Sequence, residues 1–321
     1  MKSLYLDGVT SVSLTKEGLV FDDRERGTRQ AIEPPELDSD LLVVQNAKGF
    51  VSWPALKVLQ MWRVTVALFD WNGKLLGTFV PYATSDPPLV IRQMEVSRDP
   101  KKALKIAKEI VAVKFERMGE AAREWGGEDY YEGIRGRHPP DKIQSVAQAR
   151  SAESILTEAY WSVFRRELKR RWPDAKFKVR GHPTHGYKMK AVDPVNAALN
   201  YAYSILEAKA RTNIARVGLS PHFGFLHSTL PGKEPLVYDL QEYERTEMDM
   251  AALEVLTDPV VQTQGFIREA DWTSRLSRPT SRLMIEAVTA AFNERTRGGT
   301  IEGRFFREAS GLRYALTGAD R

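Results

Sequence analysis

Short apolar runs separated by polar turns dominate residues 1–85, a pattern typical of β-strands. The two runs before and after DWNG, residues 70–73, predict a hairpin, because an asparagine-glycine pair favours a tight turn. One segment differs: residues 53–62 have the spacing of a short helix. The predicted strands are 4–6, 11–14, 19–21, 41–45, 65–69 and 74–81.

From residue 89 the apolar residues recur at helical spacing instead. Asp99 and Pro100 form a good N-cap and N1 pair. The apolar stripe that follows contains Leu104, Val111, Phe115 and Met118. Further helices are predicted at 141–171, 193–217, 246–257, 279–296 and 303–316, and the one at 193–217 ends before Gly218.

This order of elements predicts an α+β protein, with an N-terminal all-β domain followed by a C-terminal all-α catalytic domain. Pro81, Pro87 and Pro88 interrupt the chain where its character changes. We therefore place the domains at 1–88 and 89–321.

Composition narrows the class of protein. Of 321 residues, 42% are hydrophobic and 28% charged, as expected of a soluble globular protein. The absence of cysteine excludes disulfides, thiolate zinc sites and cysteine nucleophiles. No apolar stretch is long enough to span a membrane and the first residues do not form a signal peptide, so we expect a cytoplasmic protein with no membrane partner. Walker A, GxSxG and HExxH motifs are also absent.

Charge is unevenly distributed behind a net charge of +5. Residues 165–190 contain ten Lys or Arg and two acids, with aromatic residues between them. This run is either a solvated helix face with a loop or a track for nucleic-acid phosphates. Residues 235–258 contain seven acids and one arginine. They form either an acidic surface or a set of carboxylates that needs a divalent cation.

Glu153 interrupts the apolar face of the helix predicted at 141–171. It lies between Ala149 and Leu156 on the stripe that continues through Tyr160 and Phe164. A carboxylate there must reach solvent, form an ion pair or bind a metal.

Three more candidates lie in GFLHSTLPGKEPLVYDLQE, residues 224–242. His227 fits either a hydrogen-bonded core histidine or a ligand. Asp239 fits either an N-cap or an acid that faces the same site as Glu242, three residues later, if a strand ends and a helix begins at Asp239. With no thiol, an imidazole and carboxylates would form a nitrogen-and-oxygen site suited to Mn²⁺ or Mg²⁺.

Three motifs resemble the Cas-one family, the integrase of the CRISPR adaptation machinery. They are ESILTEAYW at 153–161, DPVNAALNYAY at 193–203, and GLSPHFGFLH at 218–227 followed by LVYDLQE at 236–242. The N-terminal half is similar to the β-domain of that family, so the resemblance covers essentially the whole chain. Ser154, Glu158 and Ser220 depart from the family pattern, where glycine, arginine and aspartate are usual.

The resemblance implies a metal-dependent DNA endonuclease and integrase that acts on double-stranded DNA with Mn²⁺ or Mg²⁺. The implied metal ligands are Glu153, His227 and Glu242, with Asp239 as a neighbouring catalytic acid. The implied assembly is a homodimer, bridged to others by the small Cas-two protein. Our candidates for contact with the DNA backbone are Arg165, Arg166, Lys169, Arg170 and Lys209.

Two other functions remain open at this stage. One is a nuclease or transposon-like integrase that acts without the Cas-two partner. The other is a non-catalytic DNA-binding subunit. A requirement for the Cas-two partner would separate the first alternative from the adaptation integrase, and DNA binding that is equal with and without Mn²⁺ would indicate the second.

Overall fold

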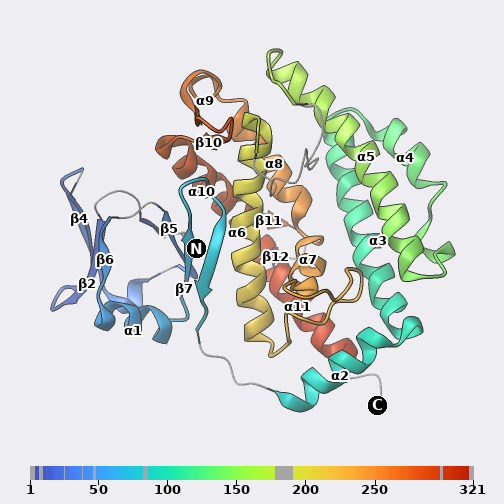
Figure 1. The fold of residues 1–321 in the computed structure, drawn as a ribbon, viewed down its shortest axis with the longest axis horizontal. Helices are drawn as coiled ribbons and strands as arrows, with labels where there is room; N and C mark the ends of the chain where they lie inside the picture. Colours follow the sequence, from blue (N-terminus) through green and yellow to red (C-terminus); the bar gives the residue numbers. More distant parts are fainter. Residues whose placement is uncertain are drawn as a thin grey trace.

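The strands of residues 4–79 lie at one end of the protein and most helices at the other (Figure 1). The structure is a computed structural model that describes residues 4–6, 10–24, 26–37, 39–45, 48–81, 86–177, 191–296 and 299–317. Strand-rich and helical parts follow each other in the predicted order, which confirms the α+β class. No helix in these ranges is both long and apolar enough to cross a membrane.

Two four-stranded sheets form the N-terminal part. The first has the order β1-β5-β7-β8, with β8 antiparallel to β7 and the other neighbours parallel. The second has the order β4-β3-β2-β6. The strands are β1 (Leu4–Leu6), β2 (Thr10–Thr15), β3 (Gly18–Asp23), β4 (Thr28–Ile32), β5 (Leu41–Gln45), β6 (Phe50–Val51), β7 (Thr65–Phe69) and β8 (Leu75–Phe79), with α1 (Trp53–Met61) before β7.

The first sheet has two buried faces because side chains alternate along each strand. Leu42 and Val66 enter a small core shared with the second sheet and α1. Leu41 and Val43 point the other way, into the large core made by the helices. The sheet therefore joins the strand-rich part to the helical part.

The helices of the C-terminal part begin largely where their caps predicted. Asp99 caps α3 through the backbone N–H groups of Lys101 and Lys102, and Asp193 caps α6. Gly218 has a φ of +74° just after α6, as a helix-ending glycine requires. The α-helices are α2 (Pro87–Arg98), α3 (Pro100–Glu124), α4 (Glu128–Arg135), α5 (Val146–Arg171), α6 (Pro194–Arg216), α7 (Pro235–Gln241), α8 (Arg245–Leu256), α9 (Pro259–Gln264), α10 (Arg278–Asn293) and α11 (Ile301–Thr317).

The prediction of an entirely helical C-terminal part was too simple. Two small antiparallel pairs interrupt it, β9 (Phe266–Arg268) with β10 (Ser274–Leu276), and β11 (Arg295–Thr296) with β12 (Gly299–Thr300). Such short strands carry too few residues for a recognisable alternation.

Helix α6 lies at the centre of the helical part and contacts the first sheet (Figure 1). The Tyr201 hydroxyl donates to Gln45 Oε1 on β5 at 2.7 Å. Lys209 lies between Asp40 and Glu302, with its Nζ 2.9 Å and 2.8 Å from their carboxylate oxygens. These buried polar contacts fix α6 against both the sheet and α11.

Candidate functional site

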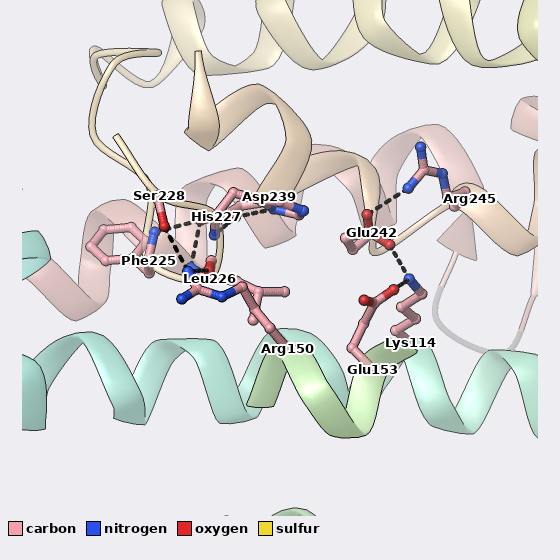
Figure 2. A network of polar contacts seen from close by, with 10 residues as sticks. All are labelled: Lys114, Arg150, Glu153, Phe225, Leu226, His227, Ser228, Asp239, Glu242 and Arg245. Atoms are coloured by element: carbon pink, nitrogen blue, oxygen red, sulfur yellow. Dashed lines mark hydrogen bonds and ion pairs between the residues drawn. The ribbon is translucent and has the colours of Figure 1, made fainter. Parts of the chain in front are cut away.

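Glu153 and Glu242 meet at one buried lysine. Glu153 extends from α5, Glu242 lies at the C-terminal end of α7, and Lys114 extends from α3 between them (Figure 2). Lys114 Nζ is 2.5 Å from Glu242 Oε2 and also contacts Glu153 Oε1. The side chains of Lys114 and Glu242 are 1% and 2% exposed, whereas that of Glu153 is 23% exposed. Glu153 is therefore the member of the group that reaches solvent.

Glu242 has a second cationic partner. Arg245 Nη1 donates to Glu242 Oε1 at 2.6 Å, and its guanidinium lies 4.6 Å from the centre of the Tyr203 ring. Burial alone would raise the pKa of Glu242, but Arg245 and Lys114 hold that pKa at about 2. The carboxylate is thus ionised at neutral pH despite its burial.

Asp239 organises the loop that carries His227. Its carboxylate accepts hydrogen bonds from the backbone N–H groups of Phe225, Leu226 at 3.0 Å and His227 at 2.9 Å. It also contacts His227 Nδ1 at 2.8 Å (Figure 2). Because an ionised carboxylate only accepts, this contact places a proton on Nδ1 and leaves Nε2 available to a ligand.

The pKa of His227 reflects the same contact. Burial would lower it, but the hydrogen bond and charge of Asp239 raise it above the ordinary histidine value. Asp239 lies inside α7, so it neither ends a strand nor caps a helix. Asp239 is fully buried and acts here as an acceptor that positions the loop.

Other side chains hold this loop from neighbouring helices. Arg150, one turn before Glu153 on α5, donates to the Leu226 carbonyl at 3.2 Å and to Ser228 Oγ at 2.7 Å (Figure 2). Gln93 on α2 is fully buried and exchanges hydrogen bonds with the backbone of Ser220. Arg150 therefore connects α5, the helix that carries Glu153, to the loop that carries His227.

Gly224 permits the loop to approach α7. A Cβ atom there would lie 2.8 Å from Pro235 Cβ and 2.9 Å from Asp239 Oδ2. A larger residue would move the loop away from the carboxylate that holds it.

Two motif tyrosines meet behind the site. Tyr160 of α5 donates to Asp249 Oδ2 at 3.1 Å, and the Tyr203 hydroxyl of α6 contacts Asp249 Oδ1. Burial, and then the charge of Asp249, raises the pKa of Tyr160 well above its usual value. These groups connect α5, α6 and α8 and give the helices that carry the site a fixed spacing.

The donor types at the site suit a divalent cation. Glu153 and Glu242 offer carboxylate oxygens and His227 offers Nε2, a set that suits Mn²⁺ or Mg²⁺. Within the described ranges, no three His, Cys, Asp or Glu side chains are grouped closely enough to hold a metal ion as they stand. The Lys114 ammonium lies on the two glutamates instead. The predicted ligands thus share one region of the structure without forming a finished metal centre.

The predicted DNA contacts divide into two groups. Arg165, Arg166, Lys169 and Arg170 lie on the C-terminal half of α5, and Arg170 is 67% exposed. Lys209 is 5% exposed and ion-paired with Asp40 and Glu302. Its prediction was wrong, because an ammonium enclosed by two carboxylates cannot reach a phosphate. Part of the basic run, residues 178–190, falls outside the described ranges.

Sequence reasoning missed Lys114, Arg150 and Arg245. Lys114 had a usable signal, because it lies three residues after Val111 and four before Met118 on the apolar stripe of α3. A buried lysine on such a face requires an acidic partner. Arg150 had no comparable signal, since its partners are backbone and hydroxyl groups of a distant loop.

Known proteins are similar to this chain in both sequence and fold. The family model described as CRISPR associated protein Cas1 matches residues 4–290. The CRISPR-associated endonuclease Cas1 2 of Pyrobaculum aerophilum is 28% identical over 94% of this chain and 94% of its own. A casposase bound to integration product has a TM-score of 0.83 and 25% identity, covering 100% of this chain and 92% of its own.

A Cas1 protein from Thermotoga maritima has a TM-score of 0.79 and 18% identity, covering 99% of this chain and 97% of its own. The match of the family model spans both the strand-rich and the helical part, and it includes Glu153, His227 and Glu242. The chain therefore belongs to the Cas1 (Cas-one) family of CRISPR-associated proteins.

Proposed function

We propose that this Cas1 protein is a divalent-metal-dependent DNA endonuclease and integrase of CRISPR adaptation. It inserts short double-stranded DNA into the repeat array when a 3′-hydroxyl attacks a phosphodiester. The observation that carries the proposal is the meeting of Glu153 and Glu242 at one buried cation, with His227 held by Asp239 of the helix that ends at Glu242. Residues from motifs far apart in the sequence thus supply one set of nitrogen and oxygen donors.

The residues of the chain would divide the work at this site. Glu153, His227 and Glu242 would hold Mn²⁺ or Mg²⁺, which supplies polarisation of the scissile phosphate and stabilisation of the charge that develops on it. Asp239 contacts His227 Nδ1 and so orients the imidazole, which would leave Nε2 free to bind the metal. Glu242 remains anionic near neutral pH because Arg245 and Lys114 stabilise its charge.

DNA would lie along the basic half of α5. Arg165, Arg166, Lys169 and Arg170 continue the helix that carries Glu153, so phosphates bound there lead towards the acidic site. Each phosphate neutralised by a cation steepens the salt dependence of binding. Replacing these four residues by glutamine should weaken DNA binding and lower its salt slope, whereas an unchanged slope would remove them from the interface.

The assembly we propose is a homodimer bridged by the Cas-two protein. Large apolar side chains are exposed on the N-terminal part, among them Trp53 at 81%, Met61 at 70% and Leu76 at 65%. Exposed apolar residues of this size favour a protein interface. Light scattering of the purified chain, with and without Cas-two, measures both associations.

A joining assay tests the reaction. A short duplex with 3′-hydroxyl ends and a supercoiled plasmid are mixed with the protein and Mn²⁺, with and without Cas-two. Glu153→Ala should abolish joining, whereas the matched variant Glu158→Ala, at a 69% exposed position of the same helix, should retain it. Circular dichroism shows whether each variant is folded.

The outcomes separate the alternatives. Joining that needs Glu153, metal and Cas-two supports the adaptation integrase. Joining or cleavage without Cas-two favours the partner-independent enzyme. DNA binding that is equal with and without Mn²⁺, with no chemistry, favours the non-catalytic subunit and contradicts the proposal.

A further inference from the structure

Lys114 is a cation enclosed at the site with the predicted metal ligands around it. It extends from α3 towards Glu153 of α5 and Glu242 at the end of α7, and its side chain is 1% exposed. Its ammonium contacts the Oε1 atom of Glu153 and lies 2.5 Å from Oε2 of Glu242. Both contacts are with carboxylates that the proposed function assigns to a divalent cation (Figure 2).

Charge explains why a cation is needed here in the metal-free protein. Glu242 is 2% exposed and Glu153 is partly buried, so two anions approach each other away from water. Such an arrangement is unfavourable unless a cation neutralises it. Arg245 contributes positive charge at Oε1 of Glu242, but Lys114 is the cation between the two glutamates.

The same geometry opposes a second cation. A divalent ion bound by Glu153 and Glu242 together would compete with the ammonium that now contacts Oε1 of Glu153 and Oε2 of Glu242. It would also lie close to a positive charge held in a poorly solvated place, where repulsion is strong. Metal binding therefore requires the ammonium to move from at least one carboxylate.

We propose that Lys114 is a positioning residue that occupies the metal-binding carboxylates and competes with the divalent cation. This inference rests on the proposed function, because it takes Glu153 and Glu242 as ligands. Lys114 holds the two acids together before metal arrives and weakens metal affinity by its charge. The protein consequently keeps the geometry of its site without metal.

Lys114→Met tests both halves of the inference, because methionine has similar length without charge. In metal-free buffer its melting temperature should fall by roughly 5–10 °C, since two acids lose their shared cation. Its Mn²⁺ affinity, measured by calorimetry, should become about tenfold tighter than that of the wild type, since the competing charge is gone. Saturating Mn²⁺ should then raise its melting temperature more than that of the wild type.

Two controls separate this effect from general loss of charge or of structure. Lys105→Met removes a charge from an exposed position of the same helix and should change neither quantity. Lys114→Arg keeps the charge and should bind Mn²⁺ no more tightly than the wild type. If Lys114→Met does not fold without metal, refolding in Mn²⁺ should recover it, whereas failure to recover contradicts the inference.

The results distinguish failure of this inference from failure of the proposed function on which it rests. Equal or weaker Mn²⁺ affinity in Lys114→Met overturns the competition, while Mn²⁺-dependent joining by the wild type would still support the integrase. If neither the wild type nor Lys114→Met binds Mn²⁺, both the proposed metal site and this inference are wrong. A tightening seen only in Lys114→Met is a result that a merely structural lysine would not produce.

Discussion

Replacing Asp239 by asparagine is the most informative change in the loop that carries His227. The carboxylate accepts from the backbone N–H groups of Phe225, Leu226 and His227 and from His227 Nδ1. The asparagine amide has one acceptor oxygen. Its NH₂ group would stand where the second carboxylate oxygen of Asp239 stood and would face N–H donors there. Whichever way the asparagine turns, two donors lose their acceptor.

The size of the effect follows from those contacts. A hydrogen bond to a charged group contributes about 1.5–3 kcal/mol, so losing two lowers the free energy of unfolding by roughly 3–6 kcal/mol. The imidazole also loses the partner that fixes its orientation. If His227 is a metal ligand as proposed, the affinity for Mn²⁺ should fall by about 10- to 100-fold, because removing the partner that orients a metal-bound histidine typically has an effect of this size.

Urea unfolding followed by tryptophan fluorescence and titration calorimetry with Mn²⁺ measure the two effects. Asp258→Asn is a matched control, because Asp258 is an exposed N-cap of α9 and asparagine caps a helix equally well. That variant should unfold within about 0.5 kcal/mol of the wild type. A loss below about 1 kcal/mol in Asp239→Asn would refute our account of the loop.

Three further variants test the surrounding structure. Lys209→Met should lower the free energy of unfolding by about 3–5 kcal/mol in urea titrations, because Lys209 neutralises two buried acids. The salt slope of DNA binding should stay unchanged, and a changed slope would show that Lys209 belongs to the DNA interface. Gly224→Ala should cost about 1–3 kcal/mol in the same titrations, and an unchanged midpoint would show that the loop moves freely. Burial and then Glu244 raise the pKa of Glu308 from 4.5 to about 8, so the folded protein binds a proton that the unfolded chain releases, and stability falls as pH rises across this interval. Glu308→Gln cannot ionise, so its melting temperature relative to the wild type should rise between pH 6 and pH 9; a constant difference would contradict the raised pKa.

Local rules predicted much of the fold because the relevant signals lie close together in the sequence. Asp193 and Pro194 mark the start of α6, and Gly218 follows its end. The start of α5 was placed five residues early, at 141, because Pro140–Lys142 forms a separate 3₁₀ turn. Ser145 caps α5 by accepting from the Gln148 N–H, and the Gln148 side chain accepts from the Gln144 N–H. A serine followed three residues later by glutamine is a helix-start signal that was present in the sequence.

The candidate site required information that periodicity does not contain. The position of Glu153 on an apolar face left open whether its carboxylate reaches solvent, forms an ion pair or binds a metal, and it could not identify a partner. Lys114 is that partner, 39 residues earlier in the chain. The burial of Lys209 was equally hidden, because its acids are 169 and 93 residues away. Charge runs in a sequence therefore identify cations, but only tertiary structure separates those that bind DNA from those that neutralise buried acids.

The contact of Lys209 with Asp40 and Glu302 has a consequence for synthesis of the chain. A nascent chain emerges from the ribosome N-terminus first, and each domain folds once its last segment has emerged. Asp40 and Lys209 emerge well before Glu302, which lies in the first turn of α11. The ion pair between Lys209 and Glu302 at the centre of the protein thus cannot form until α11 has left the ribosome. Nascent chains stalled before residue 301 should therefore remain sensitive to protease.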